Sequence, residues 1–349
     1  MADAHTRGPA STRRRKKKSP WYLKLLVTIG AMLMVASAGS YIAFVGLTNR
    51  YENKVDKEDI LGGIPMPEAA EGETNAAMNF LMLGSDSRDI ESTEQTDSTG
   101  SRSDTIMIVH IDKDRRGAFI VSIPRDSYVN VPAGGKWRGG KNKINAAFSF
   151  GGANLTAKTV YELTNVPLNG AVIVNFAGVH AMVSAVGGVR VCIPYKVKSS
   201  FTTKVWEKGC HDMGPDEAEE FMRQRKGTPG GDLGRIKNQQ HVLKALAGKA
   251  TETGILSNPV KLDRLLTTTA ESLTIDKNMN LRDLAFALKG IDPNNIKFAT
   301  VPILGTMTTD AGSSVQLDDA GAKELFAAIR EDRTDAWLAA HPQPEVASL

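Results

Sequence analysis

The sequence is poor in the residues that build metal centres from sulfur and imidazole. It has two cysteines, Cys192 and Cys210, and six histidines among 349 residues. No C-x-x-C or H-x-x-x-H spacing occurs, and the histidine nearest to a cysteine, His211, directly follows Cys210. Zinc sites depend on such spacings. A zinc site built on the two cysteines is therefore not expected.

The chain also lacks an excess of basic residues once its N-terminus is set aside. Residues 1–24 hold eight Lys/Arg and one acid, whereas the rest holds 35 cations and 38 acids, a net charge of −3. Binding to a polyanion through bulk charge needs a positive excess. No helix-turn-helix pattern, internal repeat or heptad is found. We therefore expect no nucleic-acid partner for residues 25–349.

One long run has no charged residue at all, LLVTIGAMLMVASAGSYIAFVGL at 25–47. As a helix it would measure roughly 35 Å, enough to cross a bilayer with some tilt. RRRKKK precedes it, so the positive-inside rule predicts a cytoplasmic basic tail at 1–24 and a single-pass membrane protein whose remainder is extracytoplasmic. A cleaved signal peptide is the alternative. It fits less well, because the run exceeds the usual apolar region of about 7–15 residues and no clear cleavage site follows.

The predicted extracytoplasmic location of residues 48–349 bears on the redox state of the two cysteines. On an exported domain, two cysteines and no third favour a disulfide between Cys192 and Cys210. Closing a loop of that size stabilises a fold by about 3 kcal/mol in the chain-entropy model. Two buried free thiols are the alternative that the sequence leaves open.

Beyond the apolar run, the pattern predicts a linker at 48–77, a folded domain at 78–331 and a flexible tail at 332–349. Short apolar runs between polar turns are typical of buried strands, and helical patterns separate them. The expected strands are 78–84, 104–111, 117–123, 170–176, 189–197 and 295–303; the expected helices fall across 144–165 and at 177–188, 215–225, 232–250, 258–272 and 281–289. This alternation predicts an α/β fold with a central mixed sheet flanked by helices, preceded by one transmembrane helix.

Charged residues follow the ends of the predicted strands. Strand ends and adjoining helix N-termini converge on one crevice in α/β sheets, which is where ligands bind. Arg235 and Gln239 are four residues apart, so they share one face of a helix. Three nearby glycines allow the backbone to turn before that helix. The polar set so placed is Asp86, Arg88, Arg102, Asp104, Arg125, Asp126, Lys143, Arg223, Arg225, Arg235 and Gln239.

Each of these motifs has an ordinary explanation when it is taken alone. GSDSR at 84–88 is compatible with an Asx turn. The pair Arg223 and Arg225 at a helix end is often a solvated partner of the helix dipole. It is the joint occurrence and order of the motifs that indicate a function.

In that order, GSDSR, RSDTIM, SIPRDSYV, KINAAF, FMRQRK and GDLGRIKNQQ resemble the LytR–CpsA–Psr family of cell-wall ligases, over about residues 78–305. The resemblance implies a membrane-anchored phosphotransferase. Such an enzyme moves an anionic glycopolymer from an undecaprenyl- or decaprenyl-pyrophosphate carrier to a peptidoglycan acceptor and forms a phosphodiester. It also suits the arginines, because guanidinium forks match phosphate oxygens.

The resemblance carries roles for individual residues. It implies that Asp86 and Asp104 hold Mg²⁺ or Mn²⁺, since these ions prefer oxygen ligands. The catalytic centre would contain Arg102, Arg125 and Asp126, with Asp126 or a metal-bound aspartate accepting the hydroxyl proton. The residues implied to bind pyrophosphate are Arg102, Arg125, Lys143, Arg223, Arg225, Arg235 and Gln239. Asn238 departs from the family, in which many members have an arginine there.

Two further interpretations concern the lipid. Apolar residues at 144–186 would either line a groove for the isoprenoid tail or belong to the ordinary core. They are Phe148, Phe150, Val160, Leu163, Phe176 and Val179. A non-catalytic polyprenyl-phosphate carrier stays open as an alternative function. A transcriptional regulator is disfavoured, because the arginines would lie across the membrane from DNA, and the basic tail suits anionic lipid better.

Overall fold

The computed structural model describes residues 55–67, 76–85, 103–255, 269, 272–279 and 290–342. The predicted span at 25–47 lies outside them, as do nearly all of the predicted helices at 258–272 and 281–289. No helix in the part of the chain that the structure describes is long and apolar enough to cross a membrane.

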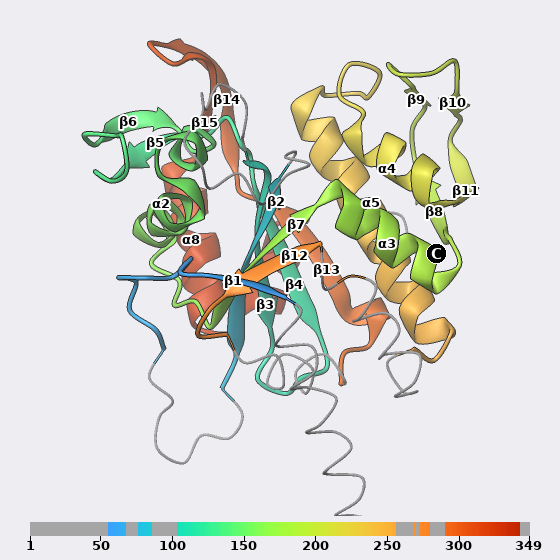
Figure 1. Cartoon of the computed structure of the whole chain (residues 1–349), viewed down its shortest axis with the longest axis horizontal. Coiled ribbons are helices and arrows are strands. Elements are labelled where there is room, and N and C mark those ends of the chain that lie inside the picture. The colour runs from blue at the N-terminus through green and yellow to red at the C-terminus, as the bar shows by residue number, and fades with distance from the viewer. Residues whose placement is uncertain are drawn as a thin grey trace, which may run out of the picture. The chain divides into compact units, whose positions relative to one another are not determined.

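A seven-stranded sheet forms the centre of the described chain (Figure 1). In spatial order its strands are β1 (Asp56–Glu58), β12 (Leu273–Asp276), β7 (Gly170–Asn175), β2 (Met78–Ser85), β3 (Ser103–Ile111), β4 (Ala118–Ile123) and β13 (Ile296–Thr300). The pairs β1–β12, β7–β2 and β4–β13 are parallel, and the other three pairs are antiparallel. The central mixed sheet predicted from the sequence is therefore confirmed.

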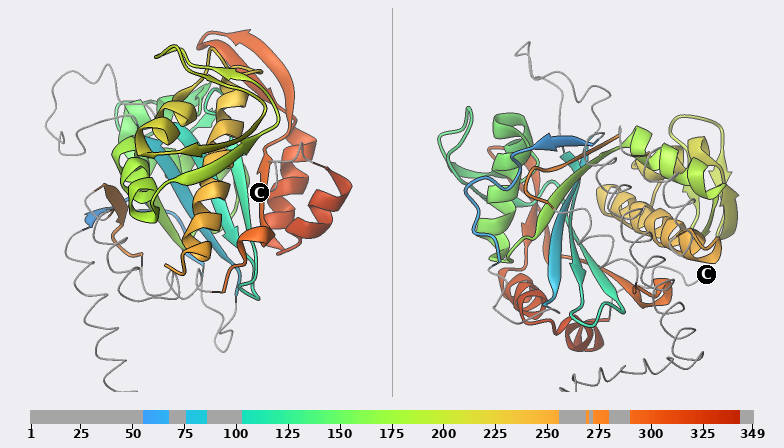
Figure 2. Two further views of the ribbon diagram at one scale, coloured as in Figure 1. Left: turned by 90° about the vertical axis from the view of Figure 1, so that its right-hand side faces the viewer. Right: turned by 60° about the horizontal axis from the view of Figure 1, so that its bottom comes forward.

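Helices cover both faces of this sheet (Figures 1 and 2). One core joins a sheet face to α2 (Ala146–Thr164), α8 (Asp319–Arg330) and α9 (Thr334–Ala340). A second core joins α3 (Phe176–Val186), α4 (Pro215–Arg223) and α5 (Asp232–Glu252) on the other side. Helices on both faces explain the nearly continuous apolar runs of the central strands.

The helix ends follow from local chemistry. Pro215 opens α4 at a first-turn position, where its fixed φ suits the helix, and Arg223 lies in the last turn beside the negative end of the dipole. Asn175 caps α3 by accepting a hydrogen bond from the Gly178 amide at 2.8 Å. The same helix stops at Gly187, whose φ of 80° is left-handed.

Besides the main sheet, the described residues form four two-stranded pairs and the 3-10 turn η1 (Pro293–Asn295). In one of them Cys192 lies directly opposite Cys210, and the two form a disulfide, as predicted. The pairs are β5 (Tyr128–Val131) with β6 (Gly140–Lys143), β8 (Val189–Ile193) with β11 (Gly209–Met213), β9 (Val197–Lys198) with β10 (Val205–Trp206), and β14 (Ile303–Thr309) with β15 (Gly312–Leu317).

Two predicted strands are each divided in the structure. The run 189–197 contains the whole of β8 and the first residue of β9, with Pro194 between them. The run 295–303 is interrupted before Ile303 by Pro302. Proline has no amide hydrogen for a strand ladder, so each run changes partner there.

The linker predicted at 48–77 is wrong for residues 55–67. β1 pairs with β12, and Ile60, Leu61 and Ile64 are buried in the first core. The Asp276 carboxylate accepts a hydrogen bond from the Leu61 amide at 2.8 Å. The short segment ILGGI at 60–64 has too few apolar residues to make a periodic pattern. Its burial therefore could not be predicted from the sequence and is seen only in the folded chain.

The flexible tail predicted at 332–349 is wrong for residues 332–342. Residues 334–340 form α9, whose Trp337 is buried, with its ring centroid 6.2 Å from that of Phe119. Trp337 and the partly buried Leu338 hold this helix against the core. Seven residues cover only two helical turns, which is too short for a clear periodic signal. Residues 343–349 lie outside the described residues.

The proposed apolar groove is also not supported as one surface. Phe148, Phe150 and Leu163 pack against the core on the α2 side of the sheet, whereas Val179 belongs to the core on the α3 side. Val160 is fully buried. Because these side chains serve cores on opposite faces of the sheet, they do not line a common channel, and the ordinary-core interpretation holds for Val160 and Val179.

Candidate active site

The end of β4 and the beginning of α5 meet at one edge of the sheet. β4 ends at Ile123, and Arg125 and Asp126 lie in the turn that follows. The Gln240 side chain donates hydrogen bonds to Ser122 Oγ at 3.0 Å and to the Ala299 carbonyl at 3.3 Å. These bonds attach α5 to β4 and β13 and thereby fix the start of α5 beside the turn that carries Arg125.

Three arginines converge on one oxygen of Asp232, the first residue of α5. Its Oδ1 lies 2.8 Å from Arg235 Nη2, 3.2 Å from Arg125 Nε and 3.7 Å from Arg225 Nε. Asp232 and Arg235 are largely buried side chains, with 16% and 8% of their surface exposed. One negatively charged oxygen is thus surrounded by guanidinium groups from three segments of the chain.

Asp232 is a site residue that the sequence alone did not single out. An acid in the first turn of a helix is a common partner of the helix dipole. Its presence there therefore does not indicate a second role in a site. The only local signal was that Asp232 is the single acid among the five cations between Arg223 and Lys237.

A second group of charges adjoins the first through Arg125. The Asp126 carboxylate lies 3.6 Å from Lys143 Nζ and 3.9 Å from Arg125 Nε, and Asn145 Nδ2 donates to it at 3.4 Å. The β5–β6 hairpin returns the chain so that Lys143 pairs with Tyr128. Lys143 therefore reaches Asp126, although it lies 17 positions further along the chain.

Glycines form the turn between α4 and α5. Gly230 and Gly231 have φ of 84° and 61°, a region that favours glycine. A Cβ on Gly227 would lie 1.7 Å from the Lys198 carbonyl oxygen, closer than atoms approach. The turn that positions Arg225 relative to Arg235 thus depends on residues without side chains.

Arg223 is held apart from the Asp232 cluster. Its Nη1 donates to Glu219 at 3.2 Å, and its guanidinium carbon lies 5.0 Å from the Phe176 ring centroid and 5.5 Å from that of Phe201. The next residue, Gln224, is fully buried and accepts a hydrogen bond from the Ser200 amide at 2.8 Å. Gln224 therefore anchors the end of α4 between the two arginines, a role that the sequence did not reveal.

The helical turn after Arg235 carries two buried amides. Gln239 is 2% exposed, and its Oε1 accepts no hydrogen bond in the described part of the chain. Asn238 accepts from the Tyr195 hydroxyl at 3.1 Å and donates to the Phe221 carbonyl and to Thr228 Oγ1. Asn238, the departure noted in the sequence, is thus a fully buried structural residue whose hydrogen bonds link α5 to α4.

The structure brings together five of the predicted site residues: Arg125, Asp126, Lys143, Arg225 and Arg235. Asp86 and Arg102 lie outside the described residues, and Asp104 belongs to β3 without a described side chain. Ile106 pairs with Ile123, so Asp104 and Arg125 lie two residues beyond that pair at the same end of the sheet. The roles of all these residues stay predictions.

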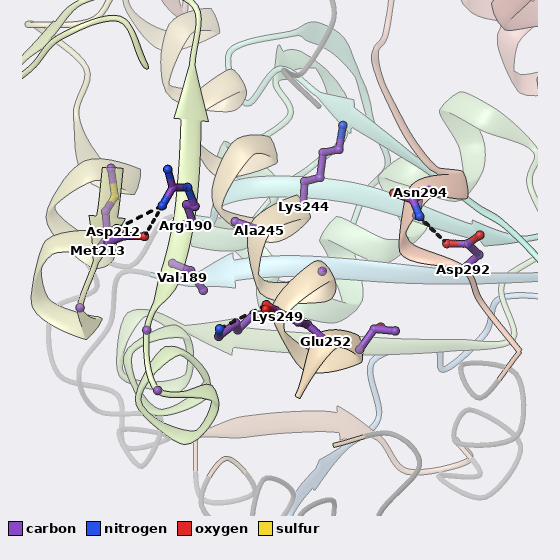
Figure 3. Close-up of a pocket in the computed structure, with 15 residues that line it drawn as sticks. Val189, Arg190, Asp212, Met213, Lys244, Ala245, Lys249, Glu252, Asp292 and Asn294 are labelled. Carbon is purple, nitrogen blue, oxygen red and sulfur yellow. Dashed lines mark hydrogen bonds and ion pairs between the residues drawn. The ribbon is translucent and has the colours of Figure 1, made fainter. Parts of the chain in front are cut away.

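A separate hollow lies near the other end of α5 (Figure 3). Its volume is ≈ 1030 Å³, and the described residues lining it include Arg190, Asp212, Lys249 and Glu252. Figure 3 shows that the first two and the last two face each other as ion pairs, at 3.4 and 3.2 Å. Arg235 and Lys249 are roughly 20 Å apart along the helix. Because its charges are balanced, this hollow fits a dense anion poorly.

We expect the buried His241, next in sequence to the two glutamines, to make stability depend on pH. Burial, followed by the charges of Lys244 and Lys237, lowers its pKa to about 4. The unfolded chain, with a histidine pKa of about 6.5, then binds the proton first, so stability is full above pH 6.5 and falls as the pH drops towards 4. The loss should be about 2 kcal/mol at pH 5.

Urea unfolding of wild type and His241→Gln at pH 7 and pH 5 measures this effect. The variant should show a smaller drop between the two pH values. His180→Gln, at a more exposed histidine, is the matched control and should behave as wild type. Equal drops in wild type and His241→Gln would show that other groups cause the pH dependence.

The described chain is thus an α/β protein with guanidinium groups gathered at one end of a mixed sheet. The chain belongs to the LytR_cpsA_psr family, whose model matches residues 43–331. It is 33% identical over 312 residues to the probable cell wall biosynthesis protein LcpB of Corynebacterium glutamicum, covering 86% of this chain and 71% of that protein.

Two Bacillus subtilis proteins extend the comparison. The polyisoprenyl-teichoic acid–peptidoglycan teichoic acid transferase TagT is 30% identical over 280 residues, covering 78% of this chain and 82% of TagT. The crystal structure of TagV superposes with a TM-score of 0.59 at 25% identity, covering 74% of this chain and 98% of TagV. The predicted family is confirmed, and so is the predicted α/β fold with a central mixed sheet, whereas the preceding transmembrane helix stays a prediction.

Proposed function

We propose that the chain transfers an anionic glycopolymer from an undecaprenyl- or decaprenyl-pyrophosphate carrier to peptidoglycan. The observation that carries this proposal is the convergence of Arg125, Arg225 and Arg235 on a single carboxylate oxygen. Three guanidinium groups around one anionic oxygen form an arrangement suited to a phosphate, whose oxygens accept paired N–H bonds. The relatives named for teichoic acid transfer to peptidoglycan support the same substrate class.

In this proposal, the pyrophosphate takes the position of the Asp232 oxygen among the arginines. Arg225, whose side chain is 53% exposed, is the member best placed to meet an incoming ligand. The more buried Arg125 and Arg235 form the floor of the site. Burial strengthens their attraction for the charge that develops on the leaving group.

The reaction is a substitution at phosphorus. The acceptor hydroxyl oxygen bonds to the phosphorus that carries the polymer, and the bond from that phosphorus to the bridging oxygen breaks. Polyprenyl monophosphate leaves and the product is a phosphodiester. Asp126 accepts the hydroxyl proton, with Lys143 and Asn145 orienting its carboxylate.

A divalent cation, Mg²⁺ or Mn²⁺, would be held by Asp86 and Asp104. The backbone supports this assignment, because Asp104 lies in β3 at the end of the sheet that carries Arg125. Carboxylates together with phosphate oxygens and water are the ligands that these ions prefer. Bound there, the ion would neutralise negative charge on the pyrophosphate.

The site would face outward from the membrane. We propose that residues 25–47 anchor the chain in the cell membrane with a cytoplasmic N-terminus. This placement gives the catalytic domain access to both a membrane-embedded lipid carrier and the peptidoglycan.

The test uses the full chain with a labelled lipid-linked sugar and an oligosaccharide acceptor from peptidoglycan. Product that requires the divalent ion and disappears in Arg125→Ala and Asp104→Ala would support the enzyme. Tight lipid binding without product would instead indicate a non-catalytic polyprenyl-phosphate carrier. Binding of neither lipid nor acceptor would contradict both functions.

A further inference from the structure

Three metal-ligating side chains gather far from the arginine cluster, beyond the opposite end of β3. His110 is the second-last residue of that strand, Asp112 follows the strand, and Asp332 lies in the turn between α8 and α9. His110 Nε2 is 3.0 Å from Asp332 Oδ1 and 3.8 Å from Asp112 Oδ1. One ligand atom from each residue lies within 4.8 Å of the other two.

The hydrogen bonds of Asn79 determine which nitrogen of His110 carries a proton. Asn79 Nδ2 donates to the Pro167 carbonyl at 3.0 Å, so its Oδ1 is the atom that faces His110 Nδ1 at 2.8 Å. An amide oxygen only accepts, and Nδ1 must therefore be the donor. In the neutral imidazole, Nε2 then has a lone pair and no hydrogen.

That lone pair points at carboxylate groups, which also have no hydrogen to donate when they are ionised. Asp332 and Asp112 are acceptors when ionised, and no donor to Nε2 is found in the described residues. His110 is completely buried, so water does not relieve the contact. The buried nitrogen and the two carboxylates all present lone pairs to one another. Because such groups repel when they are unpaired, the arrangement requires a cation between them.

Charged groups of both signs surround the three side chains, so the balance close to them matters. Two further acids, Asp114 and Asp335, act electrostatically on Asp112, and Asp335 is itself paired with Lys297 at 2.5 Å. Lys113 is the facing cation, 3.9 Å from Asp332 Oδ2, but its side chain is 71% exposed. The Arg115 guanidinium is directed partly elsewhere, donating to the Ala76 carbonyl at 2.8 Å.

We propose that His110, Asp112 and Asp332 bind a divalent first-row transition metal ion, with Zn²⁺ as the representative. Imidazole and carboxylate ligands suit such an ion at about 2.0–2.2 Å, and two neighbouring ligands at that distance lie about 3.0–3.5 Å apart. The separation of 3.0 Å between His110 and Asp332 meets this, and the part-exposed Asp112 closes the third side by rotating. Asn79 serves as the outer partner that orients the histidine.

Of the three ligands, Asp112 lines a cavity of ≈ 180 Å³, and we expect the ion to enter from that side. The cavity has space for water to complete the coordination. The bound ion fastens the end of β3 to the turn before α9, whereas the oxygen-only site at Asp86 and Asp104 would serve the reaction. The two sites differ in ligand chemistry and in place.

The experiment compares the full chain with its Asp332→Asn variant. Asparagine has the same shape and tolerates the left-handed φ of 52° at this position, so the variant should fold. The chains are stripped with a chelator, loaded with Zn²⁺, desalted and measured by elemental analysis. Affinity is measured by competition with a chromophoric chelator. Asp335→Asn, at a neighbouring exposed acid, is the matched control.

Wild type and Asp335→Asn should hold one zinc ion more than Asp332→Asn, whose affinity at this site should fall at least tenfold. Zinc should raise the Tm of the first two by several degrees, with no such rise in Asp332→Asn. Zinc at any other site counts equally in all three chains. Equal zinc content in wild type and Asp332→Asn would overturn the proposal and leave a proton on Nε2 as the cation.

Discussion

The Asp232→Asn variant is expected to be about 3 kcal/mol less stable than wild type in the absence of a polyanion. Asp232 Oδ1 is the shared counter-charge of Arg125, Arg225 and Arg235. Removing its charge leaves three guanidinium groups close together, two of them largely buried, without the carboxylate that they share. Chemical denaturation of both proteins in phosphate-free buffer measures the difference.

The same variant should bind inorganic pyrophosphate more tightly, by about tenfold or more. In wild type, an incoming anion competes with the Asp232 carboxylate for the arginines, and in the variant it does not. Saturating pyrophosphate should therefore restore much of the lost stability, because a ligand that binds only the folded state shifts the unfolding equilibrium. Isothermal titration and thermal unfolding with increasing pyrophosphate give the two values.

Glu219→Gln is the matched control for this experiment. It removes the carboxylate that pairs with Arg223 at 3.2 Å, in a more exposed i,i+4 pair on α4. Such pairs contribute about 0.3–0.5 kcal/mol, so its stability should change little. An Asp232→Asn variant as stable as wild type, with unchanged pyrophosphate affinity, would show that Asp232 does not organise the arginines.

The sheet core was predictable because each of its central strands is a continuous run of mostly apolar residues. Residues 78–84, 104–111 and 117–123 are buried on both faces, so nearly every position signals its environment. β6 has the sequence GKNK, with no apolar residue, and β1 is DKE. These strands form because a neighbouring segment supplies hydrogen-bond partners, which a local pattern cannot indicate.

The candidate site was predictable where it follows from strand ends and helix starts. Arg125 comes after a buried strand and Arg235 lies in the first turn of a helix, so both are directed to one edge of the sheet. Asp232 was missed because its ordinary role at a helix start explained it. His110 and Asp332 are separated by 222 positions, and only the folding of α8 against the sheet brings them together.

The Arg125→Lys variant is expected to lose about 10²–10³-fold in kcat/KM for the proposed transfer, the usual effect of removing one donor to a developing charge. Lysine keeps the positive charge but not the planar fork that binds two phosphate oxygens. Arg125 is held between Asp232 and Asp126, with its side chain 13% exposed. Because so little water reaches this position, water cannot replace the hydrogen bonds that the shorter lysine side chain would lose. Single-turnover assays with the lipid-linked donor separate binding from the transfer step.

Arg190→Lys is the control for that substitution. Arg190 is a 62% exposed arginine that pairs with Asp212 at the far hollow, so the same chemical change there should leave kcat/KM unchanged. Stability should be close to wild type in both variants, because the charge is kept. If Arg125→Lys retained full activity, the guanidinium geometry would be irrelevant to catalysis, and positive charge alone at this edge of the sheet would account for pyrophosphate binding.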